Sequence, residues 1–147
     1  MVDRSKLQEL TDTILSGDID AGGDNPEVSR RELAGMVDHT LLKPEATPQQ
    51  IRKLCREAEQ YNFASVCVNP IHVKQCVKDL QGRIPVATVI GFPLGANHPA
   101  IKAGEAHQAL SDGAAELDMV INIGMLKSGE LEFVEDDIRS VVEAAPD

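Results

Sequence analysis

The sequence predicts an α/β protein in which four β-strands alternate with four helices along a parallel sheet. From residue 37 onward, short β-prone runs alternate with capped amphipathic segments. The runs at residues 64–68 and 86–90 are continuously apolar or small, which is typical of strands buried on both faces of a parallel sheet. The composition agrees with a globular fold, because 42% of the residues are hydrophobic and 26% are charged.

Residues 1–30 are predicted to form a helical leader followed by an acidic, glycine-containing linker. Apolar residues recur at helical spacing in residues 3–16, and Gly17 ends that pattern. Residues 17–25 are rich in aspartate and glycine, which favours a linker. Asn25-Pro26 then predicts the start of a short helix that buries Leu33 and Met36. Residues 31–147 form the predicted folded domain.

Four βα units follow in order. The predicted strands span residues 37–42, 63–68, 85–92 and 115–123, and the helices span residues 47–61, 69–80, 97–112 and 128–145. Thr47-Pro48-Gln49-Gln50 has the spacing of a capping box, and Asn97 is the expected N-cap of the third helix. Apolar residues form one face on three of these helices: Ile51, Leu54, Cys55 and Ala58; Val73, Cys76, Val77 and Leu80; and Leu131, Val134, Ile138, Val141 and Val142.

The spacing of the strand ends favours half of a TIM (β/α)8 barrel. They recur about every 28 residues, so eight such repeats would approach the roughly 250 residues of a complete barrel. The alternative is a complete doubly wound sheet of four or five strands, which suits the length better. The sequence lacks the Gly-x-Gly-x-x-Gly fingerprint, which weakens only the dinucleotide-binding members of that alternative.

Charge and composition exclude several classes of function. The formal net charge of −10 disfavours binding to nucleic acid or to anionic membranes. No apolar run approaches the roughly 20 residues of a membrane span, and the amino terminus has no apolar signal segment, so the cytoplasm is the expected location. The three cysteines form no Cys-x-x-Cys pair and the four histidines form no His-Glu-x-x-His motif. We therefore expect neither a disulfide framework nor a metal or other cofactor.

Asp118 is the first candidate for a functional residue. It lies within the apolar run of residues 115–121, and an ionised carboxylate in a buried strand is costly unless another group compensates for it. At the carboxyl ends of barrel strands such a residue commonly serves catalysis. The alternative is that Asp118 faces outward, caps a loop or forms a structural salt bridge.

Further candidates lie on the first three strands. Asp38 and Thr40 share one side at the strand period of two, whereas a turn or capping role for Asp38 remains the alternative. His39 points the other way and is interpreted as a packed or surface histidine. Residues 91–98 form a tight loop at an expected ligand-binding edge, and Cys67 is interpreted as a small buried residue without nucleophilic activation. The run 135–137 is interpreted as a solvated helix face.

Four of these segments together resemble the deoxyribose-phosphate aldolase family. They are Val-Asp-His-Thr-Leu-Leu-Lys-Pro at 37–44, Ala-Ser-Val-Cys-Val-Asn-Pro at 64–70, Val-Ala-Thr-Val-Ile-Gly-Phe-Pro-Leu-Gly-Ala at 86–96 and Glu-Leu-Asp-Met-Val-Ile-Asn-Ile-Gly at 116–124. The resemblance implies a TIM barrel and a metal-free Schiff-base aldolase. Such an enzyme reversibly cleaves 2-deoxy-D-ribose 5-phosphate to glyceraldehyde 3-phosphate and acetaldehyde.

The resemblance also implies roles for individual residues. Asp118 matches the carboxylate that relays protons beside the reactive lysine. Asp38 and Thr40 match residues at the substrate end of the pocket, and Cys67 matches a pocket-side strand end. These residue types suit the chemistry, because a carboxylate and a water must move protons as a carbinolamine becomes an imine.

The sequence departs from the family at the reactive amine. The family's Schiff-base lysine lies on the sixth strand in a Val-Lys-Thr-Ser-Thr-Gly-like run, and neither this run, a lysine-bearing seventh strand nor the phosphate-binding loops after strands seven and eight occur in these 147 residues. Lys43 and Lys127 are expected in solvated loops, where an amine keeps a pKa near 10.4. We therefore expect no activity from the chain alone.

Two interpretations of function remain. In the first, the chain is part of an aldolase and requires a complementary C-terminal half. In the second, it is a non-catalytic half-barrel that binds a partner chain or a sugar phosphate. Both predict association with another chain or self-association, because a half-barrel leaves unpaired strand edges and an open face, which is expected to carry Val66, Val68, Val89 and Met119.

Overall fold

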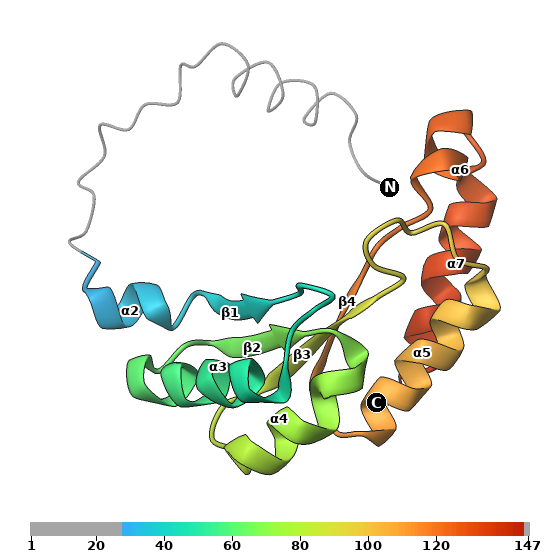
Figure 1. Cartoon of the computed structure of the whole chain (residues 1–147). Helices are drawn as coiled ribbons and strands as arrows, with labels where there is room; N and C mark the ends of the chain where they lie inside the picture. Colours follow the sequence, from blue (N-terminus) through green and yellow to red (C-terminus); the bar gives the residue numbers. More distant parts are fainter. Residues whose placement is uncertain (1–27, 146–147) are drawn as a thin grey trace, which may run out of the picture.

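The computed structural model describes residues 28–145, and within them a single parallel sheet forms the centre of the fold. Its strands are β1 (Asp38–Leu41), β2 (Ser65–Val68), β3 (Val86–Ile90) and β4 (Glu116–Met119), in the order β1-β2-β3-β4 (Figure 1). The predicted helix at 3–16 and linker at 17–25 lie outside the described residues. The sequential order confirms the predicted half-barrel, since a doubly wound sheet reverses its strand order near the middle.

The helices of the described chain are α2 (Arg30–Ala34), α3 (Pro48–Tyr61), the 3-10 turn η1 (Pro70–His72), α4 (Val73–Leu80), α5 (Pro99–Ser111), α6 (Ile123–Ser128) and α7 (Leu131–Glu143). Of these, α3, α4 and α5 pack directly on one face of the sheet, and α7 packs against α5. Figure 1 shows α3 and α4 beside β1 to β3, and α5 and α7 side by side on the β3 and β4 side. No helix among residues 28–145 packs on the opposite face, which we call the open face.

Local hydrogen bonds explain where several elements begin. Thr47 and Gln50 form the predicted capping box of α3. Beyond Met119, the predicted fourth strand gives way to α6, because the Asn122 Oδ1 accepts from the Met125 N–H at 3.1 Å. A strand predicted to reach residue 123 therefore ends four residues earlier.

Ser29 caps α2 through a reciprocal capping box with Glu32, and the predicted cap Asn25 lies outside the described residues. Leu33 and Met36 are exposed in this segment, so their predicted burial is wrong. The predicted cap of α5 is wrong as well. At α5 the cap is His98, one residue beyond Asn97, and its Nδ1 accepts from the Ala100 N–H.

The main core lies between the sheet and the helices. Its buried members are Ile51, Leu54, Cys55 and Ala58 of α3, Val73, Cys76 and Leu80 of α4, Val66, Val68, Val86 and Ile90 of the central strands, Ala106 and Ala109 of α5, Val141 of α7, and Ile84 and Ala114 before β3 and β4. The expectation that Val66, Val68 and Met119 face the open side is wrong, because all three pack in this core. Val89 lies on the open face with Cys67 and Ala87. Side chains alternate along a strand, and the continuous apolar sequence did not reveal which set faces the helices.

The loop from β3 to α5 packs tightly against the segment that follows β4. Gly95 has φ +64°, and a Cβ at this position would lie 2.0 Å from the backbone oxygen of Ile121. Gly82 has φ +78° with no heavy atom within 4 Å of the corresponding position. Of these two glycines, Gly95 combines left-handed backbone geometry with a steric requirement, and Gly82 has the backbone geometry alone.

We expect Gly95→Ala to lower the free energy of unfolding by about 3 kcal/mol, because the chain must move to relieve the overlap. Gly82→Ala, the matched control, is expected to cost only about 1 kcal/mol, from the left-handed geometry. Urea unfolding of the two variants measures the difference. Equal losses would show that the packing of Gly95 against Ile121 does not constrain this loop.

Candidate functional site

The open face of the sheet carries a compact polar surface. Register and side-chain alternation place eight residues on it: Asp38, Thr40, Ser65, Cys67, Ala87, Val89, Glu116 and Asp118. The residues from the two central strands are small and buried, whereas those from β1 and β4 are exposed. All four predicted site residues, Asp38, Thr40, Cys67 and Asp118, therefore share one face, and that face lies opposite the helices.

The four residues differ in their level along the strands. Thr40 pairs with Cys67 across β1 and β2, and Asp118 pairs with Val89 one step nearer the carboxyl end of the sheet. Asp38 begins β1 and pairs with Ser65 at the amino end of β2. The prediction that Asp38 projects from the same carboxyl end as Asp118 is therefore wrong, because Asp38 is the first residue of β1 and Asp118 is the third of the four residues of β4.

Hydrogen bonds fix the residues on β1. The Ser65 hydroxyl donates to Asp38 Oδ1 at 2.6 Å, and the Thr40 hydroxyl donates to the backbone oxygen of Asp38 at 2.8 Å. Ser65, which sequence reasoning missed, thereby orients the Asp38 carboxylate across the two strands. Its signal in the sequence is a lone hydroxyl in an otherwise apolar strand.

The pKa of the Cys67 thiol responds to the burial and the negative charge of the open face. Burial, together with the smaller effect of the negative charges of Asp118, Asp38 and Glu116, raises the pKa of this thiol to about 11. The thiol is therefore protonated at neutral pH, in agreement with the expectation that Cys67 is no activated nucleophile. Cys55 and Cys76 lie in the helix-side core, where the Cys76 thiol donates to Cys55 and the Cys76 pKa is raised by this contact.

We expect the folded chain to alkylate at Cys67 with a pH midpoint near 11, because only the thiolate reacts. Asp118→Asn should move this midpoint down, since it removes a neighbouring negative charge. Iodoacetamide labelling with mass spectrometry measures both, and labelling in urea is the reference. A midpoint at the ordinary value of 9 would contradict the described placement of Cys67. The raised pKa also means that this thiol's contribution to stability is complete below pH 9 and is lost as the pH rises through about 11.

The open face carries carboxylates without a matching cation. Asp38, Glu116 and Asp118 are its three ionisable acids, and none of its eight residues is a lysine, arginine or histidine. A phosphorylated or carbonyl substrate held here would need an amine or an anion-binding group from another chain segment.

The lysines of the described part of the chain do not fill this role. Lys43 is exposed after β1, and Lys127 is exposed in α6 rather than in a loop as predicted. Lys102 is fully buried, but it faces the helix layer, where its Nζ donates to Asp137 Oδ2 at 2.5 Å and to the Val120 oxygen at 3.0 Å. None of the three presents a free amine to the open face.

The buried pair of Lys102 and Asp137 is the feature that sequence reasoning missed most clearly. Asp137 was interpreted as part of a solvated helix face, and it is 0% exposed. The signal was helical spacing: Asp137 shares the buried face of α7 with Val134 and Val141, as Lys102 shares that of α5 with Ala106 and Ala109.

His39 lies on the helix side of β1, as predicted. Its ring stacks on Phe63 with centroids 4.7 Å apart, and its Nε2 lies 2.9 Å from Glu57 Oε2 of α3. The contact with His39 lowers the pKa of the Glu57 carboxyl. His39 is therefore a packed histidine that joins β1 to α3, away from the open face.

Within residues 28–145, no three histidine, cysteine, aspartate or glutamate residues are grouped so that they would hold a metal ion. Over the same part of the chain, no helix has the length and apolar character that a bilayer span requires. The polar side chains of the open face are carboxylates, hydroxyls and one thiol.

The fold indicates the class of protein. A (β/α)8 barrel is built from eight parallel βα units in sequential order, and this chain forms four such units with polar residues on the inner face of the strands. Residues 33–147 match the DeoC/LacD family of aldolases. The chain belongs to this family.

Individual relatives agree with this assignment. A deoxyribose-phosphate aldolase of Clostridium perfringens is 56% identical over 119 residues, which cover 80% of this chain and 53% of that protein. That of Streptococcus mutans is 62% identical over 112 residues and is covered to 51%. The chain thus spans about half the length of the curated relatives it matches.

Solved structures show the same relationship. A Coccidioides immitis protein assigned to the deoxyribose-phosphate aldolases superposes with a TM-score of 0.77 at 38% identity, over 93% of this chain and 57% of that one. The tetrameric deoxyribose phosphate aldolase of Aeropyrum pernix gives a TM-score of 0.69 at 34% identity, over 78% of this chain and 48% of that one. The four βα units described here therefore correspond to about half of an aldolase barrel.

Proposed function

We propose that this chain supplies the first half of the site of a deoxyribose-phosphate aldolase. Such an enzyme cleaves 2-deoxy-D-ribose 5-phosphate to glyceraldehyde 3-phosphate and acetaldehyde through a Schiff base and without a metal or cofactor. In this proposal Asp118 relays protons, and Asp38, Thr40 and Cys67 belong to the substrate pocket. Membership of the aldolase family supports this reaction, and it also supports a cytoplasmic location.

The observation that carries the proposal is the shared open face of the four residues. A carboxylate that faced the helices would have no route to a substrate, whereas Asp118 is exposed near the carboxyl end of β4 on the inner side of the sheet. There a carboxylate and a water can accept and return a proton while a carbonyl becomes an imine.

The amine must come from outside the described site. None of the 147 residues forms a Val-Lys-Thr-Ser-Thr-Gly-like run, and the open face has no lysine. Because only an amine can form the imine, we propose that the chain does not cleave the substrate by itself. Phosphate binding likewise requires groups from a complementary half, since the open face is negatively charged.

We propose that the complementary half joins at the free edges of the sheet. β1 and β4 each pair with only one neighbour in the described structure. Beyond β4, six large apolar side chains are exposed on α6 and α7: Ile123, Met125, Leu126, Leu131, Ile138 and Val142. An unpaired strand edge beside exposed apolar side chains favours addition of a further βα unit.

The test is reconstitution of the barrel from two chains. The second chain would be the part of the Clostridium perfringens aldolase that lies beyond its match to this one. We expect no cleavage and no borohydride-trapped acetaldehyde adduct from the 147-residue chain alone, and both activities from the mixture. A single-site adduct on the isolated chain, or a mixture that assembles without activity, would refute the proposal.

The second candidate is a non-catalytic half-barrel that binds a partner chain, a sugar phosphate or a second copy of itself. The same exposed apolar residues on α6 and α7 favour association with a protein. Analytical ultracentrifugation of the chain alone tests self-association. If the chain self-associates tightly and rejects the complementary half, this candidate replaces the first.

A further inference from the structure

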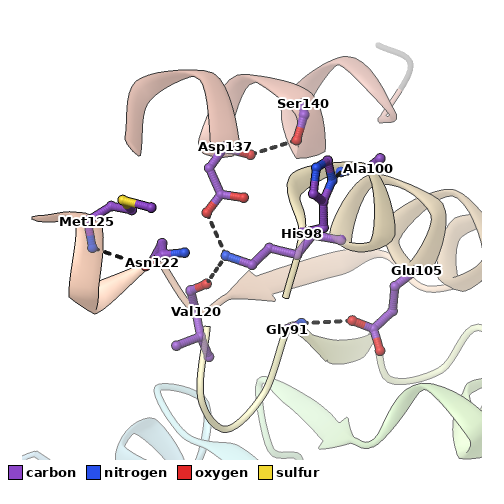
Figure 2. Close-up of polar contacts among 10 residues, drawn as sticks. Gly91, His98, Ala100, Glu105, Val120, Asn122, Met125, Asp137 and Ser140 are labelled. Carbon is purple, nitrogen blue, oxygen red and sulfur yellow. Dashed lines mark hydrogen bonds and ion pairs between the residues drawn. The ribbon is translucent and has the colours of Figure 1, made fainter. Parts of the chain in front are cut away.

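Three ionisable side chains lie behind the carboxyl ends of β3 and β4, on the helix side of the sheet. Lys102 of α5 and Asp137 of α7 are 0% exposed, and their Nζ and Oδ2 atoms are 2.5 Å apart. Glu105, one turn beyond Lys102 on α5, is half-buried. We call Lys102, Glu105 and Asp137 the polar cluster; Figure 2 shows its contacts with Gly91 and Val120.

Two members of the polar cluster, Lys102 and Glu105, bind the backbone where a strand ends. The Lys102 Nζ donates to the backbone oxygen of Val120, which follows β4, at 3.0 Å. Glu105 Oε2 accepts from the backbone N–H of Gly91, which follows β3, at 2.7 Å. Helix α5 thus binds the residues that follow two adjacent strands, β3 and β4, through side chains one turn apart.

The backbone that Lys102 binds is close in sequence to Asp118 of the open face. Val120 is two residues beyond Asp118, and its own N–H donates to the Ile90 oxygen at 2.9 Å. Both peptide groups of Val120 are therefore fixed, one by β3 and one by Lys102. Gly91 is fixed in a similar way, because its N–H binds Glu105 while its oxygen accepts from the Gly95 N–H at 2.8 Å.

A contribution to stability alone does not explain the buried ion pair of Lys102 and Asp137. An apolar pair of similar volume is often as stable as a buried ion pair, because desolvation offsets the attraction. The Asp137 Oδ1 is buried and has no hydrogen-bond partner within the described chain, which adds to that cost. What the charged pair provides and an apolar pair would not is a donor directed at the Val120 oxygen.

We propose that Lys102, Glu105 and Asp137 are positioning residues that fix the ends of β3 and β4, and thereby the level at which Asp118 enters the open face. The proposal rests on the proposed function only in taking Asp118 as the carboxylate of the site. Asp137 acts through Lys102, since it holds the ammonium group over Val120.

Amide hydrogen exchange of the full 147-residue chain tests this positioning. In the double variant Lys102→Met/Asp137→Leu, the amides of Val120, Met125 and Leu126 are expected to exchange at least about tenfold faster, relative to those of α3 and α4. Arg139→Met is the matched control, because it removes an exposed ion pair from the same helix, α7. It should leave these relative rates unchanged.

A second variant tests the other part of the polar cluster. Glu105→Ala changes a half-buried residue, and it is expected to speed exchange of Gly91 and Gly95 by about tenfold without affecting α3 and α4. Unchanged relative rates in either variant, or a uniform acceleration over the chain, would overturn the proposal. If the double variant does not fold, Glu105→Ala decides the outcome. Exchange needs no catalysis, so an inactive reconstituted barrel would refute the proposed function and leave this test intact.

Discussion

Asp118→Asn is expected to lower kcat for deoxyribose-phosphate cleavage by about 100-fold or more in the reconstituted barrel, with assembly unchanged. The amide has nearly the shape of the carboxylate but cannot accept and return a proton. Steady-state kinetics with the complementary half in excess measures the loss, and ultracentrifugation confirms that the complex forms.

Glu116→Gln provides the matched control for this experiment. Glu116 lies on the same strand and the same face, two residues nearer the amino end, level with Cys67 across the sheet. Its neutralisation removes the same charge from the open face, and kcat should change by only a few-fold. Equal losses in the two variants would show that the reaction senses the negative charge of the face rather than proton transfer at Asp118.

Asp137→Leu is expected to lower the free energy of unfolding by about 3–5 kcal/mol, because it leaves the fully buried Lys102 ammonium without its counterion. Urea denaturation of the 147-residue chain measures this change. Such a loss is a large fraction of the stability of a domain of this size.

The double variant distinguishes lost pairing from lost packing. Lys102→Met/Asp137→Leu is expected to remain within about 2 kcal/mol of the original chain, since both charges are removed together. Arg139→Met is expected to change stability by about 0.5 kcal/mol or less, because its partners Glu135 and Asp136 are exposed. A double variant as unstable as Asp137→Leu would attribute the loss to packing rather than to the unpaired charge.

The order of the elements was predictable from the sequence because its determinants are local. Capping at Thr47 and the continuous apolar runs of β2 and β3 are short-range patterns, and the structure agrees with both. The ends of elements were less predictable. Asn122 ended the fourth strand early because an asparagine side chain that caps a helix competes with continued strand pairing.

Some polar residues of interest were likewise predictable from local sequence, and others were not. Asp118 was a candidate from the sequence alone because a carboxylate within an apolar run is visible without knowledge of the tertiary structure. Asp137 was missed because it stands in an acidic run whose neighbours Glu135 and Asp136 are exposed. The spacing of Asp137 to Val134 and Val141 put it on the buried face of α7, but its partner Lys102 lies 35 residues away and only the packing of α5 against α7 joins them.

By itself, the sequence determined that the chain forms four parallel βα units, that it resembles an aldolase family, and that it contains no lysine run able to form the family's imine. Only the tertiary structure decided which strand residues face the helices, that Asp38 lies at the amino end of β1, and that Lys102 and Asp137 meet in the interior. The physical reason is that alternation along a strand shows which residues share a face, but it does not show which of the two faces packs against the helices. A face becomes inner or outer only when helices from distant parts of the chain pack against it.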